Sequence, residues 1–215
     1  MRIVAGLFGL LLLGAAPLDS QLVLQNYARA LARLSTPPYA IFSYAVSQAG
    51  PNDIEQRHRI YRSGLNVRDE TISVDGAKPK TAAISIGRRE DRYAVGKLAP
   101  RPGLYELLFV RPIVIGARTD YLFDAVPFAK GATGFVVTHV TIDGEAFLPR
   151  SIGFHSTSLA TRGDGEIRYA AFAGNWMPVL ATVRASVNGQ PARERIAFGD
   201  YRFPTSLPPS TFGRR

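Results

Sequence analysis

The spacing of hydrophobic residues along this chain changes once, from a helical period to the short runs of β-strands. From residue 21 to residue 34, in QLVLQNYARALARL, apolar side chains recur every three or four positions, which is typical of a helix with one buried face. That face carries Leu24, Tyr27, Leu31 and Leu34. Asp19 and Ser20 are both good N-caps, and Pro37 and Pro38 stop the pattern. The sequence therefore predicts one amphipathic helix near its N-terminal end.

Beyond residue 38 the pattern becomes that of β-strands. Short runs of Val, Ile, Tyr and Phe are separated by turn residues. We predict strands at residues 39–48, 54–62, 65–74, 81–87, 91–97, 119–126, 134–142, 145–157, 166–172, 176–187 and 192–203. Asp75-Gly76, Asp143-Gly144 and Asn188-Gly189 are strong hairpin signals, and together they predict a meander of antiparallel neighbours.

The clearest alternation lies in the strand predicted at residues 176–187. Its odd-numbered positions are apolar: Met177, Val179, Ala181, Val183, Ala185 and Val187. Polar side chains on the other face predict that one face alone is buried. In the strand at 39–48, Phe42, Tyr44 and Val46 form a large apolar face, and Ile41 on the other side indicates cover on both faces.

The stretch from Leu98 to Ala117 fits neither period clearly. LYELLFV suits a helical turn or a strand, and Pro100, Pro102 and Pro112 interrupt the run. Two interpretations remain open. The stretch either covers the mouth of a pocket or is an ordinary connection with one extra packed element.

The first twenty residues have the pattern of a secretory signal. Arg2 is followed by an apolar run from Ile3 to Leu13 and then by small residues. The run is shorter than the ~20 apolar residues of a membrane-spanning helix. We expect residues 1–20 to be a signal peptide, residues 21–205 a single domain and residues 206–215 an irregular tail. The expected location is the periplasm or another extracytoplasmic compartment.

Composition narrows the chemistry further. The chain has no cysteine, which excludes disulfides, thiolate metal sites and a cysteine nucleophile. Its formal net charge of +9 favours acidic partners. An exported chain rarely meets nucleic acid, so we expect none and favour an anionic membrane surface. The alternative is that the arginines reflect genomic base composition and lie on solvated faces.

No catalytic or metal-binding constellation is found. His58, His139 and His155 stand in separate predicted strands, without the paired spacing of zinc ligands. The motifs G-x-S-x-G, S-x-x-K, G-x-G-x-x-G and G-x-x-x-x-G-K-[ST] are all absent. Adjacent acids such as Asp69-Glu70 point to opposite faces of a strand. We therefore expect neither enzymatic activity nor a cofactor.

The order of the parts resembles a known superfamily. An amphipathic helix precedes a long meander that ends with FLPRSIGFHS, GEIRYAAFAGNWMPVLATV and ARERIAFGDYRFPTSLPPSTF. This arrangement is similar to the outer-membrane lipoprotein-sorting superfamily, which includes LolA, LolB and RseB. The resemblance implies a mainly β fold with minor α, in which a strongly curved antiparallel sheet forms a half-barrel beside the N-terminal amphipathic helix. It also implies an apolar cavity that takes acyl chains.

Two functions follow from these observations. The first is a carrier or sensor that binds lipid or lipoprotein acyl chains in the cavity, with arginines near the mouth facing acidic head groups. The second is a protein–protein interaction module of the cell envelope whose core is filled by its own side chains. The predicted cavity-lining residues are Phe42, Tyr44, Ile152, Phe154, Met177, Val179 and Val183. A connected apolar cavity of several hundred Å³ distinguishes the carrier from the module.

Overall fold

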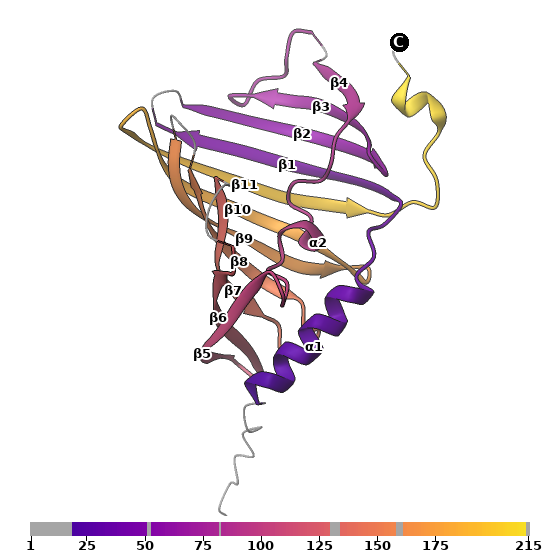
Figure 1. The fold of residues 1–215 in the computed structure, drawn as a ribbon. Coiled ribbons are helices and arrows are strands. Elements are labelled where there is room, and N and C mark those ends of the chain that lie inside the picture. The colour runs from indigo at the N-terminus through magenta and orange to yellow at the C-terminus, as the bar shows by residue number, and fades with distance from the viewer. Residues whose placement is uncertain (1–18, 51–52, 82, 130–133, 158–160, 214–215) are drawn as a thin grey trace, which may run out of the picture.

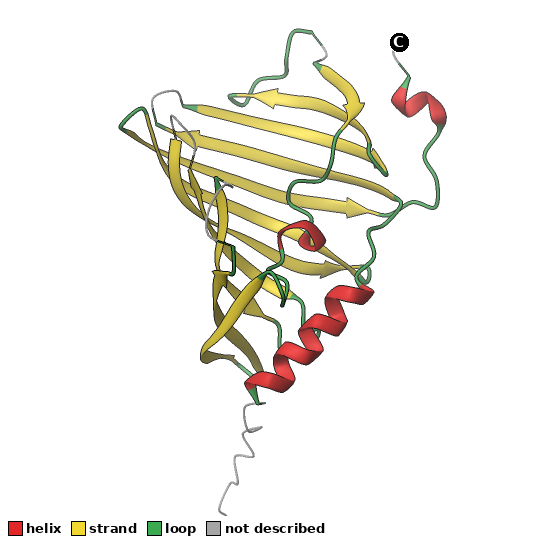
Figure 2. Ribbon diagram, viewed as in Figure 1, coloured by secondary structure: helices red, strands yellow, loops and turns green. Residues whose placement is uncertain are grey.

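A computed structural model describes residues 19–50, 53–81, 83–129, 134–157 and 161–213. The helices are α1 (Ser20–Arg33), α2 (Val95–Leu98) and the 3-10 turn η1 (Pro209–Phe212). The strands are β1 (Tyr39–Ala49), β2 (Ile54–Ser63), β3 (Asn66–Val74), β4 (Ile84–Arg88), β5 (Tyr105–Ile115), β6 (Arg118–Pro127), β7 (Phe135–Ile142), β8 (Pro149–Thr157), β9 (Thr161–Phe172), β10 (Asn175–Val187) and β11 (Gln190–Arg202). Strands account for most of the described chain (Figure 2), as the sequence predicts.

All eleven strands belong to one antiparallel sheet with the order β4-β3-β2-β1-β11-β10-β9-β8-β7-β6-β5. Strands that follow one another in sequence pair with each other, except β4 and β5, which lie apart, and β1 pairs in addition with β11. The sheet is curved and stays open, with β4 and β5 as its two edges within the described residues (Figure 1). The predicted meander is therefore confirmed, and its first and last strands meet in the middle of the sheet.

Local turn chemistry explains two of the three predicted turns. Asp75-Gly76 and Asn188-Gly189 both have positive φ at the two turn positions, the conformation that Asn-Gly and Asp-Gly pairs favour. Asp143-Gly144 behaves differently. The buried Asp143 carboxylate accepts hydrogen bonds from the amides of Glu145 and Ala146, which makes the β7–β8 connection longer than a two-residue turn.

The predicted strand at residues 91–97 is wrong. This segment holds α2, and the Asp91 carboxylate accepts a hydrogen bond from the Tyr93 amide at 3.0 Å, a local bond that turns the backbone away from an extended course. The irregular stretch at 98–117 instead supplies edge strand β5. Since β4 and β5 lie at opposite edges, the chain between them must cross the sheet.

The predicted amphipathic helix forms, from Ser20 to Arg33. Asp19 caps it by accepting a hydrogen bond from the Gln21 amide at 2.7 Å. Val23 and Tyr27 are fully buried, and the rest of the predicted apolar face, Leu24, Leu31 and Leu34, packs partly buried against the main core. The face of the sheet that α1 and the β4–β5 connection cover is called the inner face below (Figure 1).

A β-bulge divides the face predicted for residues 176–187. Pro178 pairs with Tyr169 and Leu180 with Arg168, so Val179 is an extra residue without a partner on β9. Ala181 pairs with Ile167, two positions from Tyr169, and therefore shares the inner face with Pro178. Met177 therefore points to the outer face. The prediction that all six odd-numbered residues share one face is wrong at the N-terminal end of the strand.

Candidate functional site

The β4–β5 connection, residues 89–104, forms the roof of the site. It is held at two points on either side of α2. The Tyr169 hydroxyl on β9 donates to the Tyr93 carbonyl at 3.1 Å, and the Tyr27 hydroxyl on α1 donates to the Pro100 carbonyl at 3.0 Å. Between these points Val95 and Ala99 are buried in the main core. We refer to residues 89–104 as the crossing segment.

A cavity of about 670 Å³ lies between the crossing segment and the inner face. Its wall is mostly apolar. The sheet contributes Tyr105, Phe135, Val137, Phe154 and Ile167, and the crossing segment contributes Tyr93, Gly96, Leu98, Ala99 and Leu104. Phe135 and Phe154 stack with ring centroids 4.8 Å apart. The volume falls within the ~300–1,000 Å³ range of ordinary ligand pockets.

The rim of this large cavity is basic. Arg92, Lys97 and Arg101 line it, all from the crossing segment, and its lining includes no Asp or Glu among the described residues. The side chains of all three cations belong to exposed residues. The cavity thus combines an apolar wall with positive charge at the solvent side.

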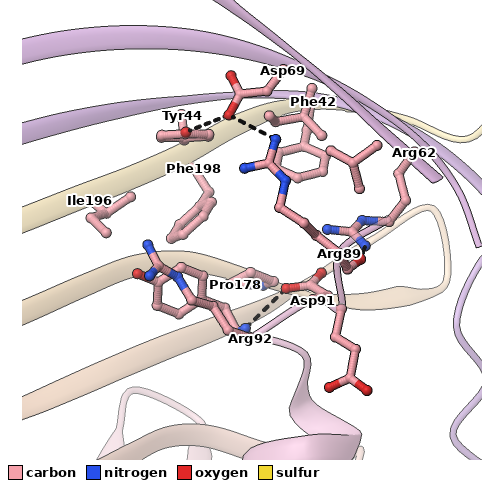
Figure 3. A pocket seen from close by; sticks show the side chains of 14 residues that line it. Phe42, Tyr44, Arg62, Asp69, Arg89, Asp91, Arg92, Pro178, Ile196 and Phe198 are labelled. Carbon is pink, nitrogen blue, oxygen red and sulfur yellow. Dashed lines mark hydrogen bonds and ion pairs between the residues drawn. The ribbon is translucent and has the colours of Figure 1, made fainter. Parts of the chain in front are cut away.

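A second cavity of about 250 Å³ lies farther along the inner face (Figure 3). Its apolar wall comes from strands in the half of the sheet that contains β1 and β11: Phe42, Tyr44, Ile60, Val67, Pro178, Ile196 and Phe198. Arg62, Arg89, Asp69 and Asp91 add a polar side. Asp69, which is 12% exposed, is the best-connected of these groups.

Asp69 interacts with three side chains. Its carboxylate contacts His58 Nδ1 at 2.8 Å. It also accepts a hydrogen bond from the Tyr44 hydroxyl at 3.2 Å and lies 3.7 Å from the Arg89 guanidinium (Figure 3). Burial acts to raise the pKa of Asp69, but the His58 hydrogen bond and charge, with Tyr44 and Arg89, together hold that pKa below its ordinary value. Burial, and then Asp69, raises the pKa of Tyr44. The cluster stabilises one charged group within an otherwise apolar wall.

Arg92 and Tyr93 line both cavities. The Arg92 guanidinium lies 4.9 Å from the centroid of the Tyr93 ring. The Tyr93 ring in turn meets Phe198 edge-on at 5.2 Å. These two residues of the crossing segment therefore stand at the boundary between the large and the small cavity.

Of the seven predicted site residues, three line a cavity and four do not. Phe42 and Tyr44 line the small cavity, and Phe154 lines the large one. Ile152 is fully buried in the main core beside Ile167. The remaining three, Met177, Val179 and Val183, line neither cavity: Met177 faces outward, Val179 forms the bulge, and Val183 packs at the margin of the main core.

The sequence did not predict that the whole crossing segment forms a wall of the site. Both interpretations of residues 98–117 apply to part of the stretch, because Leu98, Ala99 and Leu104 line the large cavity and the rest supplies the extra packed element β5. The available signal was the irregular apolar run itself. Its contact with the sheet depends on the separation of β4 and β5, which local pattern does not encode.

Two classes of feature are absent from the described residues. Among them, no group of three or more His, Cys, Asp or Glu side chains is placed to hold a metal ion. A search of the same residues finds no helix with both the length and the hydrophobicity to span a bilayer. The predicted signal peptide falls almost entirely on residues 1–18, which lie outside the described part.

Comparison with solved structures finds alignments along most of the chain at low identity. No protein-family model and no curated protein sequence matches the chain. A LolA superfamily protein from Nitrosomonas europaea aligns with 15% identity and a TM-score of 0.44, covering 92% of this chain and 99% of its own. An outer-membrane lipoprotein-sorting protein domain from Vibrio parahaemolyticus aligns with 13% identity and a TM-score of 0.47, covering 90% and 97%. A DUF1329 family protein from Desulfovibrio piger gives 10% identity and a TM-score of 0.47, covering 90% and 96%. Each of the three alignments covers at least 90% of this chain, at 15% identity or less.

Proposed function

We propose that this protein binds an acyl chain of a lipid or lipoprotein in the large cavity and serves as a carrier or sensor outside the cytoplasm. The observation that carries the proposal is the cavity of about 670 Å³ beneath the crossing segment, with its apolar wall. An empty apolar cavity of this size is unfavourable because its wall lacks contacts on one side. A flexible hydrocarbon chain supplies them.

The energetics favour such a ligand. Each methylene group moved from water into an apolar site contributes about 0.8 kcal/mol, so a chain of about fifteen methylenes contributes about 12 kcal/mol. The loss of translational and rotational freedom on association costs about 4–15 kcal/mol. Apolar burial of one acyl chain therefore offsets most or all of this cost.

A second candidate function is supported by a separate observation. Edge strand β5 and its neighbour β6 carry exposed large apolar side chains, among them Leu108, Val114, Ile115 and Val126. A free strand edge with apolar side chains is a common surface for pairing with another chain. Under this interpretation the protein is an interaction module of the cell envelope, and the cavity is incidental.

The acyl-chain proposal is tested by ligand content. The full chain is expressed, purified under mild conditions and examined by native mass spectrometry, which is expected to show a bound lipid or lipopeptide mass. A fluorescent fatty-acid probe is expected to bind at micromolar concentration and to be displaced by hexadecanoate. No bound mass and no probe binding would instead favour the interaction module.

Matched variants locate the binding. Val137 is 2% exposed and lines the large cavity, so Val137→Phe places a ring in the space that the chain needs, whereas Val137→Ile adds one methylene. We expect the Phe variant to weaken probe binding at least about tenfold and the Ile variant to change it little. Equal melting temperatures show that both variants are folded. Equal probe affinities would place the ligand elsewhere.

Export is a separate part of the proposal. Its support is the charge and apolar run of residues 1–20. Fractionation of cells that express the full chain is expected to recover a shortened protein outside the cytoplasm. Recovery of the untrimmed chain in the cytosol would contradict it.

A further inference from the structure

Only one of the three cations at the rim of the large cavity, Lys97, forms an ion pair among the described residues. Lys97 is paired with Glu90 at the surface. Arg92 and Arg101 have no carboxylate within ion-pair distance among the described residues, although Arg89, three positions before Arg92, pairs with Asp69. The charge at the rim is therefore left for a ligand or for solvent.

The geometry of these two arginines keeps them at the rim. The Arg92 guanidinium lies over the Tyr93 ring, and Arg101 donates a hydrogen bond to the Gly96 carbonyl at 2.9 Å. A guanidinium has five N–H donors, so one hydrogen bond or one ring contact leaves most of them available. Both groups face a cavity wall that is apolar immediately inside them.

We propose that the ligand of the large cavity is an amphiphile with one anionic head group, a carboxylate or a phosphate monoester, which Arg92 and Arg101 bind at the rim. Its hydrocarbon tail occupies the space lined by Phe135, Val137 and Phe154. This inference rests on the proposed function and specifies the class of ligand. Planar guanidinium groups suit both anions because they present paired donors to two oxygen atoms.

The expected magnitude is moderate. Ion pairs exposed to water strengthen binding by about 1.4- to 5-fold each, and the effect weakens with salt. The tail supplies most of the affinity, and the rim decides between head groups and fixes the orientation of the ligand. Discrimination between head groups is therefore the informative measurement, more than affinity itself.

The first experiment uses two ligands with the same tail. Hexadecanoate and hexadecanol compete for the fluorescent probe on the wild-type protein, and the acid is expected to bind about five- to tenfold more tightly at low salt. That preference is expected to shrink at high ionic strength. Equal affinity would overturn the head-group inference while leaving the acyl-chain proposal intact. Binding of neither ligand would overturn the acyl-chain proposal itself.

The second experiment assigns the preference to residues. The double variant Arg92→Gln/Arg101→Gln is expected to bind hexadecanol as the wild type does and to lose the preference for the acid. Arg101→Lys keeps the charge without the planar donors and is expected to retain part of it. The control is Arg59→Gln/Arg202→Gln, which removes the same charge from exposed residues of β2 and β11 that line neither cavity. The assignment to Arg92 and Arg101 would be overturned if their double variant kept the preference for the acid. It would also be overturned if the control variant lost that preference equally.

A third arm separates an amphiphile from a free anion. A lysophospholipid with a phosphate monoester head is expected to displace the probe in the same Arg-dependent manner as hexadecanoate. Inorganic phosphate alone is expected not to displace it at millimolar concentration, since it gains nothing from the apolar wall. Displacement by inorganic phosphate would show a site for a free anion and overturn the inference.

Discussion

The hydroxyl of Tyr169 donates a hydrogen bond of 3.1 Å to the main-chain carbonyl of Tyr93, and so joins the centre of the sheet to the crossing segment. Tyr27 on α1 makes the equivalent bond to Pro100. Burial raises the pKa of both tyrosines, so both remain protonated donors over the ordinary pH range. The roof of the large cavity is thus fixed by two phenol hydroxyls.

Removing either hydroxyl is expected to loosen the roof. Tyr169→Phe and Tyr27→Phe each leave a buried carbonyl without its donor, which lowers the free energy of unfolding by about 1–3 kcal/mol. Hydrogen exchange at the amides of residues 97–99 is expected to accelerate. Tyr201→Phe is the control, because the Tyr201 hydroxyl bonds to the Pro178 carbonyl, outside the crossing segment. Faster exchange of the same amides in Tyr201→Phe would show that the effect is not local.

Gly96→Ala is expected to stabilise α2. A Cβ at Gly96 meets only the Leu34 Cδ2 atom, at 3.7 Å, which is an ordinary van der Waals contact. Alanine restricts the unfolded chain more than glycine does, so the free energy of unfolding rises by about 0.5–1 kcal/mol. Urea denaturation measures this change in the free energy of unfolding. Gly103→Ala, at φ +97°, is the matched control and is expected to lower stability because an L side chain is strained there. A loss of stability in Gly96→Ala would contradict the contact described.

Gly165→Ala is expected to disturb both the sheet and the large cavity. A Cβ at Gly165 would lie 2.4 Å from Phe154 Cζ and 2.7 Å from the Thr182 carbonyl oxygen. Overpacking of this kind lowers the free energy of unfolding by about 1–3 kcal/mol, and a displaced Phe154 ring would reduce probe binding. Gly87→Ala, where a Cβ meets nothing within 4 Å, provides the control. Equal stability of the two variants would contradict the close packing of Phe154 on Gly165.

Asp69 is expected to make stability depend on acid pH. Because its folded pKa lies below the unfolded value of about 3.9, its stabilisation is complete above that value and is lost as pH falls through the folded pKa. The difference in unfolding free energy between wild type and Asp69→Asn should therefore shrink as pH falls below about 4. Denaturant titrations at several pH values test this. Asp124→Asn, at an exposed residue of β6, controls for the lost charge. A difference independent of pH would contradict the assignment.

Asp19 is expected to stabilise α1. Its side chain caps the helix, so Asp19→Ala in the uncleaved chain should lower the free energy of unfolding by about 1 kcal/mol, whereas Asp19→Asn should change it little. Urea denaturation measures both variants. Equal stability of Asp19→Ala and the wild type would contradict the cap.

Short-range features were predictable because their causes lie within a few residues. Asn188-Gly189 forms its hairpin because both residues tolerate positive φ, and the spacing of Tyr27 and Leu31 places them on one helical face. The antiparallel meander followed from these turns. For the same reason the helix and most strand positions are confirmed to within a few residues.

The sequence led us to expect an apolar cavity, but only some of the residues named for its wall line either cavity. Phe42, Tyr44 and Phe154 line the two cavities, since they fall on regular strand faces that the sheet turns inward. Met177 and Val179 do not, because the bulge beside Pro178 reverses the alternation. A proline lacks the amide that a regular ladder needs, but whether the strand bulges there depends on its neighbours β9 and β11.

The residue pattern alone predicts a mainly β chain with one amphipathic helix, antiparallel neighbours and an excess of positive charge. It does not predict which face is inner, where the crossing segment lies or which arginines reach the rim of the large cavity, because these depend on the fold. The difference arises from the range of the interactions. Periodicity and turn propensity act between residues a few positions apart, whereas the roof depends on contacts such as that of Tyr169 with Tyr93, which are 76 positions apart in the chain.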